Sequence, residues 1–278
     1  MTKAALMCYN EYREKAIKGE ARAKMKEKIY TIPINEAYET DCECPLCKLE
    51  AQLESDGIDY ALGAAMMEPD YRVESNSVGY CNKHFGMMFA KPNKLSLALV
   101  LDTHLAEIRE KLGKMEKKAE GMSKGKSSIF KRSANGETIS EISGQLKQIQ
   151  DGCMVCNKIN HTMERYADVL LYMWANDAQF KAKFDKSKGV CLKHMQLLLE
   201  TSKKSLNDKQ AGMFAAELLK KQIGELERIQ EDIHKFTLKF DYRYTNMEWG
   251  TAQDAPVRTI EKISGRIRTA EDEENENA

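Results

Sequence analysis

Cysteine and histidine side chains occur in two matched sets along this chain of 278 residues. Each set consists of a CxxC pair followed, at nearly the same distance, by a CxxH pair. The first set comprises Cys44, Cys47, Cys81 and His84, and the second comprises Cys153, Cys156, Cys191 and His194. A single CxxC is a weak signal, but two such units in register predict an internal duplication.

Three thiolates and one imidazole are the ligands that a zinc ion takes in a closed tetrahedral site. Two ligands three positions apart, in a turn or at a helix N-terminus, can face one ion, and a second pair brought back by the chain completes the four. Because no position is left for water, such a site is structural rather than catalytic. We therefore expect two structural zinc sites, one formed within each consecutive set.

Other chemistries of the same cysteines fit the sequence less well. A redox role for the CxxC pairs stays open, although the βαβ pattern of thioredoxin-like proteins surrounds neither pair. An iron–sulfur cluster normally takes four cysteines. Covalent haem needs a histidine directly after CxxC, where Lys48 and Asn157 stand. Simple packing of reduced cysteines does not account for two sets with the same spacing.

The remaining cysteines and histidines lack such a pattern. Cys42 is either a substitute ligand or a spare thiol, and Cys8 has no partner pattern. Three lone histidines are expected to be ordinary surface residues of helices: His104, His161 and His234. The sequence contains no GxSxG, GxxxxGK[ST], HExxH or GxGxxG motif, and no pair of carboxylates stands out. We therefore expect a protein without catalysis.

Helices are expected to position these residues. The chain has only 5 Pro and 16 Gly and is rich in Lys, Glu and Met, which favours a mostly helical fold. Apolar residues recur at helical spacing over residues 155–175 and 207–240. The predicted fold class is all-α: two duplicated helical units, each with a Cys₃His metal knuckle, joined by the long packing helix at 207–240.

Composition shifts divide the chain further. We expect an N-terminal helical extension at 1–28, a first CxxC/CxxH helical unit at 29–118 and a second at 138–240. Residues 119–137 between them are rich in Gly, Ser and basic residues, which predicts a flexible basic linker. An aromatic loop and C-terminal helix follow at 241–264, and a disordered acidic tail at 265–278. Either Met1 or Met25 serves as the natural start.

The segment after the long helix is rich in aromatic residues. Tyr242, Tyr244 and Trp249 are large side chains with polar tips, and exposing them together invites aggregation. We therefore expect at least two of them to be buried as a cap on the helical body, with Asp241 and Arg243 paired beside them. The alternative is that Tyr242, Arg243, Tyr244 and Trp249 wall a small-molecule pocket or a partner surface.

Charge and hydropathy exclude several classes of protein. Lys and Arg total 43, as do Asp and Glu, so the net charge of zero argues against a strongly basic nucleic-acid binder. No run approaches the roughly 20 apolar residues that span a bilayer, and the N-terminus does not resemble a secretory signal. We expect a cytoplasmic protein with reduced thiols, without a membrane partner, that binds another protein.

Several motifs together resemble one family. They are Ile32-Pro33-Ile34-Asn35-Glu36, Cys44-Pro45-Leu46-Cys47, Gly79 to His84, the second Cys/His set, and Asp241-Tyr242-Arg243 through Trp249-Gly250. The chain resembles, over roughly residues 28–264, an uncharacterised bacterial family catalogued as domain of unknown function 6062. The resemblance implies no activity.

The residues themselves favour a zinc-binding helical protein that acts as an interaction or scaffold protein. Two alternatives remain open at this point. One is a thiol redox protein or metal/redox sensor, and the other is a ligand binder or enzyme with a pocket under the aromatic loop.

Overall fold

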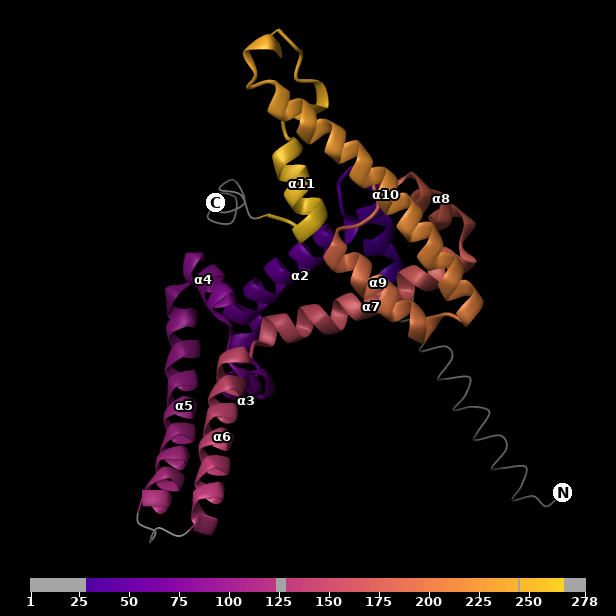
Figure 1. Ribbon diagram of the computed structural model, residues 1–278. Coiled ribbons are helices and arrows are strands. Elements are labelled where there is room, and N and C mark those ends of the chain that lie inside the picture. Colours follow the sequence, from indigo (N-terminus) through magenta and orange to yellow (C-terminus); the bar gives the residue numbers. More distant parts are fainter. Residues whose placement is uncertain (1–28, 124–128, 245, 268–278) are drawn as a thin grey trace, which may run out of the picture. The chain divides into compact units, whose positions relative to one another are not determined.

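The computed structural model describes residues 29–123, 129–244 and 246–267 (Figure 1). Every regular element among these residues is a helix and none is a strand, which confirms the all-α class. Within this described part, no helix has both the length and the apolar character needed to cross a bilayer. The expected extension at 1–28 and most of the acidic tail lie outside the described residues.

The described helices form two compact units that are not consecutive in sequence. Unit 1 combines the described residues up to Ala51 with His161–Ile267, and unit 2 comprises Gln52–Asn160. The chain enters unit 2 within α2 (Pro45–Leu62) and leaves it within α7 (Met154–Asn176). This division differs from the predicted units at 29–118 and 138–240, because each CxxC helix is long enough to belong to both units.

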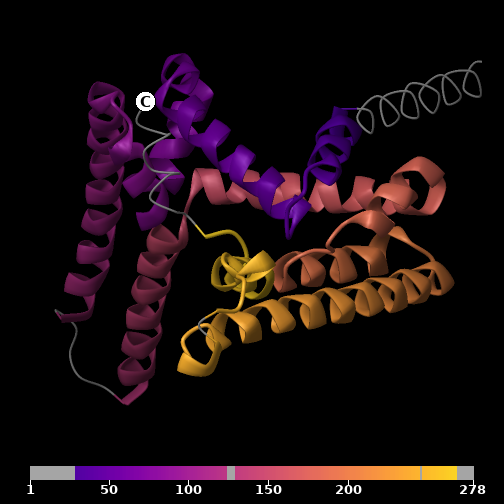
Figure 2. The same ribbon diagram turned by 90° about the horizontal axis from the view of Figure 1, so that it is seen from above.

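Unit 1 contains the longest helix of the described chain. Its elements are a helix at residues 29–39, the start of α2, the end of α7, α8 (Ala178–Lys186), α9 (Leu192–Ser205), α10 (Asp208–Leu238), η2 (Tyr242–Tyr244), η3 (Gly250–Ala252) and α11 (Ala255–Ser264). Helix α10 confirms the helix predicted at 207–240. It packs on α9 and α11 within unit 1, instead of joining two units as expected (Figure 2).

An aromatic core holds unit 1 together. Phe180, Phe184 and Phe214 come from α8 and α10 and are fully buried. Tyr38, from the helix at 29–39, meets Phe180 with ring centroids 5.1 Å apart, and Trp174 of α7 meets Phe214 at 5.1 Å. Edge-to-face packing of this kind adds to the stabilisation from apolar burial. The first helix of the described residues is thereby fixed to helices more than 130 positions later.

Unit 2 is built around a pair of long helices. After α2 come η1 (Ala64–Met67), α3 (Pro69–Val78), α4 (Asn82–Ala90), α5 (Lys94–Ser123) and α6 (Ile129–Asp151). Helix α5 packs on α3, α4 and α6, and the two long helices lie side by side in both views (Figures 1 and 2).

The predicted flexible linker at 119–137 is wrong for most of its length. Helix α5 continues to Ser123 and α6 starts at Ile129, so only residues 124–128 fall outside the described chain. The Gly- and Ser-rich composition lowers the intrinsic helix propensity of this stretch, but tertiary context overrides such weak preferences. Here the contact between α5 and α6 provides that context.

Candidate metal centres

Both CxxC pairs stand at the N-termini of helices. Cys44 precedes α2 and Cys47 lies in its first turn, where the Cys47 backbone N–H donates to the Cys44 carbonyl at 3.1 Å. Cys153 and Cys156 have the same places on α7, and the Cys156 N–H donates to Cys153 Sγ at 3.4 Å. The partial positive charge of a helix N-terminus favours thiolates at such positions.

The two CxxH loops share one backbone conformation. Cys81 caps α4 with φ −73° and ψ 165°, and Cys191 caps α9 with φ −73° and ψ 164°. Two residues earlier, Gly79 and Gly189 have φ of 77° and 78°, a region that only glycine adopts readily. A Cβ on Gly79 would also lie 2.5 Å from the His104 ring. These glycines let the chain turn into a helix whose first turn presents Cys and His together.

The eight predicted residues gather into two groups of four. Within each group, one ligand atom from every residue lies within 4.8 Å of the others. Site 1, in unit 1, consists of Cys44, Cys47, Cys191 and His194, and site 2, in unit 2, consists of Cys81, His84, Cys153 and Cys156.

The predicted pairing within each consecutive set is therefore wrong. Each CxxC pair meets the CxxH pair of the other set, so that all of site 2 lies within the stretch of chain between the two halves of site 1. The physical reason lies in α2. His84 lies beside Glu54, and Glu54 is seven residues, or about 10 Å, further along this helix than Cys47. His84 is therefore too far along the helix to share an ion with Cys47.

The geometry of both groups fits a tetrahedral ion. In site 1, His194 Nδ1 lies 3.4, 3.4 and 3.3 Å from the sulfurs of Cys44, Cys47 and Cys191. In site 2, His84 Nδ1 lies 3.2, 3.1 and 3.4 Å from those of Cys81, Cys153 and Cys156. Ligands at zinc bond lengths in a tetrahedron lie about 3.5–3.8 Å apart. The donor set and its spacing therefore suit zinc without rearrangement of the backbone.

Glutamates face the outer nitrogens of both histidines. Glu54 Oε1 lies 2.8 Å from His84 Nε2, in hydrogen-bond geometry. Glu50 Oε2 lies 3.3 Å from His194 Nε2 without that geometry. A carboxylate in this position fixes the ring orientation and makes the imidazole a better ligand. Neither glutamate was predicted as a site residue, although their spacing of three and seven residues after Cys47 places them on one face of α2.

The charges within each group support one another. Burial alone would raise the pKa of Cys153, but hydrogen bonds from His84 and from the Cys156 backbone lower it to about 6. Burial lowers the pKa of His84, yet its contacts with Cys153 and Glu54 raise it to about 9. In site 1, hydrogen bonds with Cys44 and Cys47 lower the pKa of Cys191. Each group thus stabilises a thiolate beside an imidazolium, and a metal ion competes with these protons.

The two sites differ in their exposure to solvent. All four side chains of site 1 are buried, whereas Cys81 and Cys156 of site 2 are half-buried. Part of the cover over site 1 comes from the residue after α11. A Cβ on Gly265, which has φ 96°, would lie 3.8 Å from Cys47 Sγ and 4.0 Å from Cys191 Sγ.

A buried lysine ties α11 to both ligand loops of site 1. Lys262 Nζ donates to the backbone carbonyl of Glu43 at 2.7 Å and to that of Lys188 at 2.6 Å. The Lys262 side chain is fully buried, and its charge lies 3.2 Å from the Glu43 carboxylate. Glu43 directly precedes Cys44, and Lys188 lies three residues before Cys191. This one ammonium group therefore fixes the positions of the two ligand loops relative to each other.

The other sequence candidates stay outside both groups. Cys42 is a half-buried free thiol, and Cys8 lies outside the described residues. His104 is buried instead of exposed as predicted, with Nδ1 2.7 Å from the Asn76 carbonyl. His161 and His234 are exposed on their helices, as expected.

The predicted burial of the aromatic residues is wrong. Tyr242 is 85% exposed, Tyr244 40% and Trp249 36%. The ion pair between Asp241 and Arg243 forms at 2.6 Å, but it lies on the surface. The reason is that the segment follows the end of α10 at Leu238 and extends beyond it. Trp249 packs on α10, with its ring 5.5 Å from that of Phe236.

Comparison with known proteins gives one match. The model of a family described as a family of unknown function (DUF6062) matches residues 25–270. Searches of curated proteins and of solved structures found no match.

Proposed function

Because the chain belongs to the DUF6062 family, whose function is unknown, we propose its function from its two Cys/His sites. Each site holds one structural zinc ion, and the protein is a non-catalytic cytoplasmic interaction or scaffold protein. The observation that carries this proposal is the closed donor set, since three sulfurs and one nitrogen fill all four positions of a tetrahedral ion. A reducing compartment keeps such thiols available to metal.

Zinc agrees with the ligands better than the other common metals. Thiolate and imidazole together select zinc and related soft ions, whereas calcium and magnesium prefer oxygen. An ion with 2+ charge and three thiolates leaves each site with a net charge of about −1. Helix N-termini at both ligand pairs of each site oppose that charge. The sites are thereby suited to hold the ion permanently instead of presenting it to a substrate.

The test is the metal content and its effect on stability. The full-length chain, purified without chelators, should contain two zinc ions per molecule by elemental analysis. A strong chelator should lower the temperature of thermal unfolding, and added zinc should restore it. Structural zinc supplies roughly 10–16 kcal/mol of apparent binding free energy in small domains. An unchanged transition after complete metal removal would show that the metal is not structural.

We place the partner surface of this protein on the aromatic segment, residues 240–250. Phe240 and Tyr242 are 76% and 85% exposed, and Tyr244 and Trp249 lie close by in sequence. Aromatic residues and arginine are enriched in the energetic centres of protein interfaces, and Arg243 lies between the two tyrosines. This exposure favours a protein partner over a pocket walled by the same residues.

The exposure of site 2 supports a second candidate function, that of a redox sensor. Cys81 and Cys156 are half-buried, and their sulfurs lie 3.9 Å apart. A peroxide can oxidise the two thiolates to one disulfide, with two electrons passing to the peroxide, which takes up two protons and leaves as water. The zinc ion of site 2 is then released.

Zinc release under peroxide separates the two candidates. With a zinc-sensitive dye present, a redox sensor should lose one ion per chain quickly and the second ion far more slowly, because site 1 is buried. A thiol reductant should restore the first ion. Equal and slow release of both ions would contradict the redox sensor, and structural zinc binding would be the remaining candidate.

A further inference from the structure

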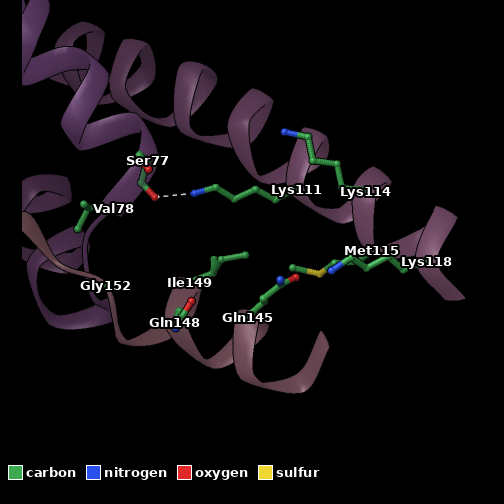
Figure 3. A pocket seen from close by; sticks show the side chains of 10 residues that line it. All are labelled: Ser77, Val78, Lys111, Lys114, Met115, Lys118, Gln145, Gln148, Ile149 and Gly152. Carbon is green, nitrogen blue, oxygen red and sulfur yellow. Dashed lines mark hydrogen bonds between the residues drawn. The ribbon is translucent and has the colours of Figure 1, made fainter. Parts of the chain in front are cut away.

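A cavity in unit 2 lies between the two long helices, and neither site uses it (Figure 3). Its volume is 560 Å³, within the range of about 300–1,000 Å³ that small-molecule sites occupy. We call it the α5/α6 cavity. Its apolar residues are Val78, Met115 and Ile149, of which Met115 is buried and the other two are half-buried. Apolar surface in this cavity is therefore left for a ligand to cover.

The polar side chains that line the cavity carry one sign of charge. They include Lys111, Lys114 and Lys118 with two glutamines, and no carboxylate is among the lining residues. Figure 3 shows Lys111 reaching along the cavity to Ser77, whose carbonyl accepts from Lys111 Nζ at 2.8 Å. Glu110, which pairs with Lys114 at 2.7 Å, is not among the lining residues, so the charged groups that line the cavity are positive and favour an anionic head group over a cationic one.

Lys111 and Lys118 can each take an additional acceptor. An ammonium group has three N–H donors. Lys111 uses one on Ser77 and approaches Glu107 at 3.6 Å, and Lys118 contacts Glu141 at 2.6 Å. The Lys118–Glu141 pair is about half exposed, and exposed pairs of this kind contribute little free energy. A carboxylate that enters the cavity can therefore join or replace these contacts at small cost.

Close backbone packing defines the end of the cavity near α3. Gly152 lines this end, and a Cβ there would lie 2.4 Å from the Val78 carbonyl oxygen. The next helix is tied to the same place, because the Met154 N–H donates to the Gly79 carbonyl at 3.0 Å. A ligand thus meets a fixed wall at this end and two lysines along one side.

We propose that the α5/α6 cavity binds a single-chain amphiphile with a carboxylate head, of the class of medium-chain fatty acids. The alkyl chain covers the exposed parts of Val78 and Ile149 beside the buried Met115, and the carboxylate contacts Lys111. The apolar residues supply most of the affinity through burial, and the lysines select the charge of the head group.

Calorimetric titration of the full-length chain with three probes tests the proposal. Decanoate carries both chain and carboxylate, decyltrimethylammonium carries a chain of similar length with a cation, and acetate carries the carboxylate without a long chain. We expect saturable binding of one decanoate per chain, measured below its micelle concentration, and no saturable binding of the other two. Equal binding of the cationic probe, or no saturable binding of decanoate, would overturn the proposal.

Two variants with matched controls locate the site. Lys111→Gln should weaken decanoate binding about tenfold, which corresponds to about 1.4 kcal/mol, and Ile149→Trp should abolish it by filling the cavity. The controls Lys220→Gln and Ile223→Trp make the same changes at exposed positions of α10 and should bind as the unaltered chain does. Circular dichroism verifies folding, and Lys111→Gln decides alone if Ile149→Trp does not fold. Unchanged binding in the folded cavity variants contradicts the assignment.

Discussion

At the scale of single residues, the two sites differ less in their ligands than in the groups that surround them. Both use three sulfurs and the Nδ1 atom of a histidine. Glu54 makes a hydrogen bond to His84, whereas the contact of Glu50 with His194 is longer and poorly aligned. Metal affinity at site 2 should therefore depend more strongly on its glutamate than affinity at site 1 does.

Glu54→Gln tests this dependence. Loss of a carboxylate behind a metal-bound histidine typically weakens metal binding about 10–100-fold. We expect a change of this size at site 2, and a smaller one at site 1 in Glu50→Gln, measured by competition with a chelating dye. Asp56→Asn, an exposed change on the same helix, is the control. Unchanged affinity in Glu54→Gln would remove Glu54 from the site.

The surface position of Arg243 gives a second prediction at this scale. In the described chain its side chain forms an ion pair with Asp241 and a cation–π contact with the Tyr244 ring. Arg243→Ala should therefore leave the urea midpoint of unfolding unchanged. Trp249→Ala should lower stability by about 1 kcal/mol, because the indole packs on Phe236. A large loss of stability in Arg243→Ala would restore the cap interpretation of this segment.

At the scale of elements, α11 acts as a brace for site 1. The buried Lys262 of α11 forms an ion pair with Glu43. The same carboxylate also pairs with Arg228 and Arg258. Helix α11 also packs on α9, the helix that carries His194, and on α10. The stability of site 1 should therefore depend on a helix that contributes no ligand.

Lys262→Met removes the brace without changing a ligand. Two backbone carbonyls lose a buried donor, so we expect a loss of about 2–4 kcal/mol in the free energy of unfolding, measured with urea. Site 1 should also release zinc to a chelator faster than in the unaltered chain. Lys235→Met, an exposed change on α10, is the matched control. Equal stability of the two variants would show that Lys262 does not brace the site.

At the scale of the whole molecule, the order of ligands along the chain sets the energetics of closure. Site 2 joins residues 69 to 75 positions apart, and site 1 joins residues 144 to 150 positions apart. The entropy cost of closing a loop grows with the logarithm of its length. Once site 2 has formed, the length of free chain that site 1 must still close is roughly halved. This lowers the entropy cost of closing site 1 by about 0.6 kcal/mol.

Double substitutions distinguish the pairing of the structure from the consecutive pairing. Cys47→Ser with Cys191→Ser removes two ligands of one site, so the chain should retain one metal ion. Cys47→Ser with Cys81→Ser damages both sites and should lose both ions. Cobalt binding, followed by thiolate-to-metal absorption, measures the number of intact sites. Cys42→Ser should retain two ions, and the reverse result for the two double variants would restore the consecutive pairing.

The sequence was sufficient to identify the eight side chains that gather into the two groups, but not how they are paired. CxxC and CxxH spacing identifies all eight residues, because two ligands must share one turn. Either arrangement of the pairs gives three sulfurs and one nitrogen, so ligand chemistry cannot choose between them. The choice depends on where α3 and α4 return along α2, which is a tertiary property. The helices at 119–123 and 129–137 escaped prediction for a similar reason, since the contact between α5 and α6 outweighs local composition.

The interposition of site 2 between the halves of site 1 also has a consequence during synthesis. Ribosomes add roughly 5–20 residues per second, so Cys191 is synthesised on the order of ten seconds after Cys47. From the synthesis of His84 onward, Cys81 and His84 are the nearest pair that offers the missing sulfur and nitrogen. Zinc that arrives early can therefore be captured by the wrong four ligands, and the nascent chain must exchange thiolates before it matures. The timing of metal supply, as well as its amount, then determines how much correctly paired protein a cell obtains.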